Sequence, residues 1–254
     1  MKFFRNIRRQ LLRESRFGRY LLYAIGEIVL VVIGILIALS INNWNQRRII
    51  REKEQFYLKA LKSEFERNKD KLQNLMEVNQ QNYKGAKTIA GMISEGVSPG
   101  EQELSQLLYH AFASEIVYNP NNSLLNEMIS SGSLKDVSNA ELRVYLTSWE
   151  SVIDNLRRQE ESLRQEREKM IDLLRTDAGS VRTIFDLSGI STQELDIPLS
   201  EQHYSNLSLL TSLAFENNLL LYISNSVSTE YVHYQPLVEL IDHILQLIDR
   251  EIEE

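Results

Sequence analysis

Residues 21–41 read LLYAIGEIVLVVIGILIALSI, and this stretch decides how the rest of the chain is interpreted. It contains a single charged side chain, Glu27. Because a helix rises about 1.5 Å per residue, the stretch is about 30 Å long, which matches the hydrocarbon core of a bilayer. Tyr20 and Trp44 flank it at the positions that aromatic rings prefer near a membrane interface. The stretch therefore predicts one transmembrane helix.

Two other interpretations of this stretch are weaker. A buried helix of a soluble protein is rarely apolar on every face over such a length. A cleaved signal peptide would need a cleavage site, which Ala38-Leu39-Ser40 loosely offers. However, the apolar region of a signal peptide is usually only about 7–15 residues long. We therefore expect an uncleaved signal anchor.

The charges on the two sides of the stretch predict its orientation. Residues 1–54 hold 11 Lys and Arg against 4 Asp and Glu; the whole chain holds 28 and 35, so 17 and 31 remain for residues 55–254. The excess of basic residues before the span predicts a cytoplasmic N-terminus. We expect a basic amphipathic cytoplasmic tail (1–20) and a periplasmic helical domain (42–254) anchored in the inner, cytoplasmic membrane. An acidic domain argues against nucleic-acid binding, which needs a basic face.

The remainder of the chain is predicted to form long helices, since it has only 10 glycines and 4 prolines. One apolar row with a spacing of seven contains Leu58, Phe65, Leu72, Ala86 and Ile93, with Asn79 in the remaining slot. A second row contains Leu142, Trp149, Leu156, Leu163 and Met170. Such rows indicate helices that pack against a partner helix.

We therefore predict an all-α fold, in which the transmembrane helix continues into an antiparallel helical bundle with long coiled-coil-like helices. Glu160 and Arg167 interrupt the second apolar row of the helix near 140–175. Because residues 157–169 are nearly all charged and leave only a narrow apolar stripe, a two-helix stalk is expected there. Residues 177–204 are expected to be irregular. Residues 207–227 are predicted to be a buried soluble helix rather than a second span, because Glu216 and two asparagines lie at their centre.

The candidate site residues all lie in the predicted membrane helix. Glu27 is a carboxylate within the span, where an ionisable group is costly and often functional. It is expected to pair with a partner helix or to carry protons, unless it stays protonated or reaches the headgroups. Gly34 and Ala38 form a small-residue pair that allows another helix to approach closely.

The sequence carries no signature of catalysis or of a cofactor. It has no cysteine, and its four histidines are scattered. It contains no His-Glu-x-x-His pattern and no phosphate-binding glycine loop. The charged run at 157–169 is interpreted as a solvated helix face. We therefore predict no catalytic residue, no cofactor, no metal site and no enzymatic activity.

Two segments resemble a known family. They are KFFRNIRRQLLRESRFGRYLLYAIGEIVLVVIGILIALSINNWNQ (2–46) and NNSLLNEMISSGSLKDVSNAELR (121–143). Both are similar to uncharacterised single-span membrane-anchored proteins that are abundant in Bacteroidota, a family defined by a domain of unknown function. The resemblance implies membrane anchoring and implies no catalytic residue.

These observations favour a membrane-anchored envelope protein whose helical domain serves as an interaction or scaffold module. Its expected partners are the lipid bilayer and either another membrane or envelope protein or further copies of the same chain. One alternative is a ligand-sensing helical module that signals through a membrane partner. Another is a subunit of a proton-driven envelope complex that uses Glu27.

Overall fold

The computed structural model describes residues 17–253, and within them every regular element is helical. The chain divides into two compact units, Met1–Phe56 and Tyr57–Glu254, which are described separately below. Most of the predicted basic tail, 1–20, lies outside the described residues. The all-helical class is confirmed for the part of the chain that is described.

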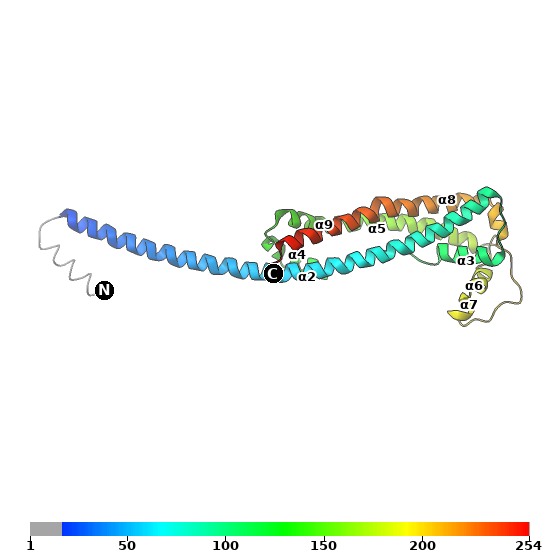
Figure 1. Cartoon of the computed structure of the whole chain (residues 1–254), viewed down its shortest axis with the longest axis horizontal. Helices are drawn as coiled ribbons and strands as arrows, with labels where there is room; N and C mark the ends of the chain where they lie inside the picture. The colour runs from blue at the N-terminus through cyan, green and yellow to red at the C-terminus, as the bar shows by residue number, and fades with distance from the viewer. Residues whose placement is uncertain (1–16, 254) are drawn as a thin grey trace. The chain divides into compact units, whose positions relative to one another are not determined.

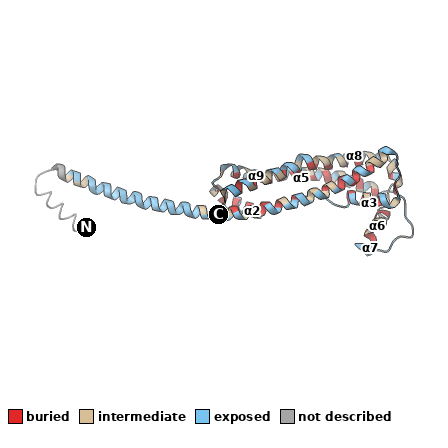
Figure 2. Cartoon of the chain, in the orientation of Figure 1, coloured by how far each residue is buried: buried red, intermediate tan, exposed pale blue. Residues whose placement is uncertain are grey.

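Helix α2 (Phe17–Glu95) begins in the first unit and ends in the second (Figure 1). In the first unit its large apolar side chains are exposed, as the pale blue of Figure 2 shows. It contains the one stretch among the described residues that is long and apolar enough to cross a membrane, and none of that stretch is buried. The predicted long apolar N-terminal helix is therefore present.

The second unit is built on α5 (Ala140–Leu174), α8 (Leu213–Ser228), α9 (Gln235–Glu251) and the part of α2 that follows Phe56. These helices lie beside one another in Figure 1, with their buried faces coloured red in Figure 2. Every member of the α5 row is buried, as are the α2 members up to Ala86. The two rows of apolar residues therefore form the centre of the core.

Helix α5 begins where its sequence predicts. The Asn139 side chain accepts a hydrogen bond from the backbone N–H of Leu142 at 2.9 Å, which satisfies one of the free donors of the first turn. The prediction of a two-helix stalk is wrong, because α5 contacts α3 (Glu101–Phe112), α8 and α9. The predicted interruption at Glu160 is in fact a buried, hydrogen-bonded side chain.

Shorter elements connect the long helices. They are α4 (Ser123–Ser130), the 3₁₀ turns η1 (Ser133–Asp136) and η2 (Leu207–Thr211), α6 (Val181–Ser188) and α7 (Ile190–Gln193). The expectation that 177–204 is irregular is therefore wrong in part. The Ser180 hydroxyl caps α6 by accepting from the N–H of Thr183 at 3.2 Å. Gly189, with φ of +87°, ends α6 in the left-handed conformation that glycine tolerates best.

A π-helical turn, η3 (Thr229–Tyr234), joins α8 to α9 without a break. Pro236 is the second residue of α9, and the proline ring would clash with the carbonyl group four residues earlier, in η3, if that turn were regular α-helix. A widened turn relieves that clash, and wide turns of this kind often occur at functional positions. The turn directs Glu230 and Tyr234 into the core, where neither is exposed.

Candidate functional site

The three residues predicted from the sequence lie on one face of α2. Helical spacing places Gly34 and Ala38 within about 20° of the direction of Glu27, since seven and eleven residues are close to whole numbers of turns. All three are exposed in the first unit. A Cβ atom added to Gly34 would meet no described atom within 4 Å. The structure therefore shows an open face with a carboxylate at one end, and no described residue pairs with Glu27.

The second unit contains a group of buried polar side chains that the sequence analysis did not identify as a site. Glu230, which is not exposed, accepts hydrogen bonds from Asn79 Nδ2 at 3.0 Å and from Gln80 Nε2 at 2.8 Å. Asn79 Nδ2 also donates to the carbonyl oxygen of Ser226 at 3.2 Å. The polar slot in the α2 row is thus occupied by a residue that ties α2 to the π turn.

A second buried carboxylate, Glu160, lies in the same region. Its Oε1 accepts from the Tyr234 hydroxyl at 2.7 Å and from the N–H of Tyr118 at 2.9 Å. Burial raises the pKa of Glu160 above its ordinary value, and the bonds from Tyr234 and Tyr118 only partly oppose that effect. Burial also raises the pKa of Tyr234, and the nearby Glu160 charge adds to the rise. Tyr234 is therefore a neutral hydroxyl that donates to the carboxylate.

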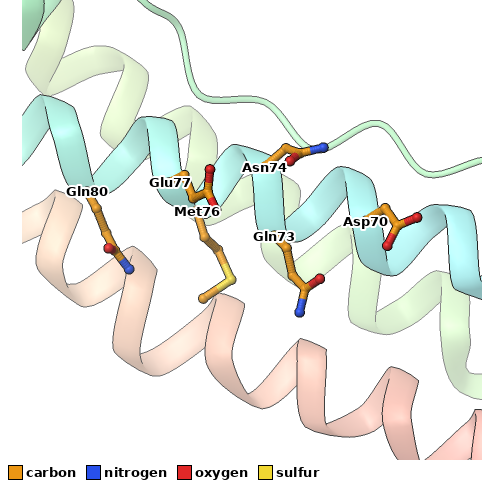
Figure 3. A pocket seen from close by; sticks show the side chains of 6 residues that line it. All are labelled: Asp70, Gln73, Asn74, Met76, Glu77 and Gln80. Carbon is orange, nitrogen blue, oxygen red and sulfur yellow. The ribbon is translucent and has the colours of Figure 1, made fainter.

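A groove on the surface of α2 ends at this polar group. It has a volume of about 650 Å³ and is lined by Asp70, Gln73, Asn74, Met76, Glu77 and Gln80 (Figure 3). All six residues belong to α2, and five of them are polar. In Figure 3 the side chains of Gln73, Met76 and Gln80 point toward the neighbouring helix, whereas Asn74 points away from it. The groove is open and has few apolar atoms, unlike the concave and mostly apolar pockets that hold small molecules.

A further cluster contains the three residue types of a hydrolase triad, but its hydrogen bonds differ from those of a triad. His203 Nε2 lies 3.0 Å from Asp186 Oδ2, and the Ser191 hydroxyl donates to Asp186 Oδ1. In a catalytic triad the serine contacts the histidine, which abstracts its proton. Here both contact the carboxylate, so the histidine is not in contact with the serine whose proton it would abstract.

The Asp186 cluster instead fastens a loop. Asp186 also accepts from the N–H of Ser200 at 3.0 Å and from Arg182 Nε at 2.9 Å. Burial opposes ionisation, but these hydrogen bonds, together with those from Ser191 and His203, outweigh it and hold the pKa of Asp186 below its ordinary value. An ionised, fully bonded Asp186 thus holds the chain after α7 against α6.

No group of three or more metal-binding side chains comes together among residues 17–253. The described chain is thus a helical protein with one long apolar helix and several buried polar contacts between helices. It belongs to the family of unknown function DUF6090, whose model matches residues 27–169, more than half of the 254 residues. No curated protein and no solved structure matches the chain.

Proposed function

We propose that this protein is a membrane-anchored interaction protein of the bacterial envelope. Residues 21–41 span the cytoplasmic membrane, the N-terminus is cytoplasmic, and the helical domain is periplasmic and binds other proteins. The observation that carries the proposal is the exposure of the leucine, isoleucine and valine side chains between Leu21 and Ile41. Lipid is the environment in which such a surface is stable.

The helical domain is proposed to be an antiparallel bundle with coiled-coil-like packing. Two ion pairs between α2 and α9 support this arrangement, Lys62–Asp249 at 2.7 Å and Lys69–Asp242 at 2.6 Å. From the first pair to the second, the position moves seven residues forward along α2 and seven back along α9. Such opposite steps are expected when two helices run antiparallel with a seven-residue repeat.

An interaction role is favoured over ligand sensing and over catalysis by the surface features described above. The groove on α2 is open and polar, and the Ser191–His203–Asp186 group lacks a base for its serine. In contrast, several large apolar side chains of the second unit are exposed, among them Leu213 and Val232. Exposed apolar residues that gather on one face commonly mark protein contacts.

Carbonate extraction and protease protection test the anchor. The full chain is expected to stay with the membrane pellet at high pH, and protease added to spheroplasts is expected to digest the helical domain. Release into the supernatant, or protection of the helical domain, would contradict the proposed anchor or its orientation. Crosslinking followed by affinity purification from native membranes then identifies the partner.

A further inference from the structure

The outward face of α8 and η3 differs from the other helix surfaces. It is formed by residues spaced three or four apart, which places them along one side of the helix. They are Leu213, Asn217, Leu220, Leu221, Ser224, Ser228, Tyr231, Val232 and Gln235, and below they are called the α8 face. None of the nine is charged, and all but the half-buried Ser228 are exposed.

Five of the nine residues of the α8 face have large apolar or aromatic side chains. Leu213 is 70% exposed, Leu221 55%, Tyr231 56% and Val232 62%. The buried side of the same helix is formed by Phe215, Leu219 and Tyr222, so the core does not need the outward residues. The prediction that this segment is buried is therefore correct for one side only. An exposed face that lacks charge has the composition of the centre of a protein interface.

We propose that the α8 face binds the same face of a second copy of this chain. The argument rests on charge. Residues 55–254 carry 17 basic against 31 acidic side chains, so two copies repel each other wherever their charged surfaces meet. A two-fold contact brings a surface against itself, and the α8 face adds no like charges to such a contact.

Membrane anchoring strengthens this association, so the inference rests on the proposed function. Two copies held in one bilayer meet at a higher effective concentration than two copies free in solution. Ser224 lies at the midpoint between Leu213 and Gln235. In a two-fold contact the midpoints of the two faces lie close to the axis, whichever way the helices run.

A groove beside the α8 face offers an unused acceptor. It lies between α5 and α8, has a volume of about 290 Å³, and is lined in part by Leu221, Ser224 and Ser228 together with Glu166 of α5. The Oε2 atom of Glu166 is buried and has no hydrogen-bond partner among the described residues. Buried acceptors are usually paired. Once the Glu166 side chain turned outward on binding, a hydroxyl of a second copy, such as that of Tyr231 or Ser224, would supply the missing donor.

Cysteine crosslinking of the full chain in its native membrane tests the proposal, because the natural chain has no cysteine. Ser224→Cys is expected to form a disulfide-linked dimer on mild oxidation. The matched control is Ser151→Cys, an exposed serine of α5, which is expected to stay monomeric. Adding Leu220→Glu to Ser224→Cys is expected to lower the dimer yield about tenfold, which corresponds to about 1.4 kcal/mol. Adding Val144→Glu, at an exposed residue of α5, is expected to leave the yield unchanged.

Two results would overturn the proposal. One is a dimer yield for Ser224→Cys no higher than for Ser151→Cys. The other is a crosslink from Cys-substituted position 224 to a protein of different mass, which identifies a different partner while leaving the proposed interaction role intact. Carbonate extraction of the same membranes shows separately whether the chain is anchored, so the two failures are distinguishable.

Discussion

Single polar side chains hold the packed helices in register. Glu160 is the one charged residue among the buried residues of α5, and both of its hydrogen bonds are made by residues distant in sequence. Asn68 has a similar role: its amide donates to the carbonyl of Asn121 at 2.8 Å and accepts from the N–H of Asn121 at 2.7 Å. A slip of one turn would leave these groups buried without partners, which costs about 1–3 kcal/mol for each group.

Glu160 is predicted to make the stability depend on pH. Because burial raises its pKa above the ordinary 4.5, the ionised form is less stable in the folded chain than in the unfolded chain. Its contribution to stability is therefore fully present below pH 4.5 and is lost as the pH rises through the folded pKa. The unfolding free energy of Glu160→Gln minus that of wild type is therefore expected to increase from pH 5 to pH 7.5. Urea unfolding of the full chain in detergent measures this difference.

The neighbouring Glu161 provides a control of opposite sign. Hydrogen bonds from Arg164 and Gln165 lower the pKa of Glu161 to about 2. The contribution of Glu161 to stability is fully present above pH 4.5. It is lost as the pH falls from 4.5 toward the folded-state pKa of about 2. Glu161→Gln and wild type are therefore expected to differ by the same amount at pH 5 and at pH 7.5. If the Glu160→Gln difference were equally flat, the raised pKa of Glu160 would be wrong.

At the scale of elements, α5 and α6 show which parts of this fold can be predicted from the local sequence. The row from Leu142 to Met170 and the all-helical class follow from the spacing of apolar and helix-breaking residues, and Asn139 is of a residue type that commonly caps a helix. The short helices α6 and α7 were missed, because eight and four residues are too few to show a helical period. Ser180 and Gly189 at the ends of α6 were the available local signals.

The buried polar group could not be predicted, since its contacts join residues far apart in the chain. Asn79 and Glu230 are separated by 151 positions, and the residues around either one do not indicate that the two are hydrogen-bonded. Spacing identified Asn79 as a polar slot in an apolar row, but only the three-dimensional packing supplies its partner. The α8 face could not be predicted either. Its leucines lie in a continuous apolar run, so their spacing does not show which of them face the core and which face outward.

Removing the Asn139 cap is predicted to destabilise α5. Asn139→Ala removes the acceptor for the N–H of Leu142 and is expected to lower the unfolding free energy by about 1 kcal/mol. Asn139→Ser keeps an oxygen that accepts this bond and is expected to stay within a few tenths of a kcal/mol of wild type. Chemical denaturation of the three proteins compares them directly. Equal losses in both variants would show that the cap does not stabilise the helix.

The Asp186 cluster is predicted to protect the loop after α7 from proteolysis. Asp186→Asn removes the charge that holds Ser191, His203 and the N–H of Ser200. Cleavage between 194 and 206 is expected to become about tenfold faster, which corresponds to about 1.4 kcal/mol of easier opening. Limited proteolysis with mass spectrometry locates the cut. Asp177→Asn, at an exposed position before α6, serves as the control and is expected to leave the rate unchanged.

For the molecule as a whole, the proposed function gives the two parts of the chain different roles. The apolar helix holds the chain in lipid, and the helical domain binds partners. The face shared by Glu27, Gly34 and Ala38 raises a second possibility, that the membrane helix itself contacts a partner or carries protons. An exposed carboxylate within an apolar helix gains stability from a partner helix that pairs with it. The two possibilities predict different consequences of the same substitution.

Glu27→Gln separates them. If the helical domain does the binding, the variant is expected to recover the same proteins as wild type in affinity purification from crosslinked membranes, because an amide leaves residues 57–254 unchanged. A proton-carrying subunit would recover the same partners as well but lose its activity, because glutamine has no titrating proton. Activity, and not recovery, therefore distinguishes these two cases. Gly34→Ile completes the comparison: it fills the open side of the helix, where a Cβ meets nothing within 4 Å. It is expected to reduce recovery only of partners that pack against that face. Loss of all partners with Gly34→Ile, while Leu220→Glu has no effect, would place the binding surface in the membrane rather than in the helical domain.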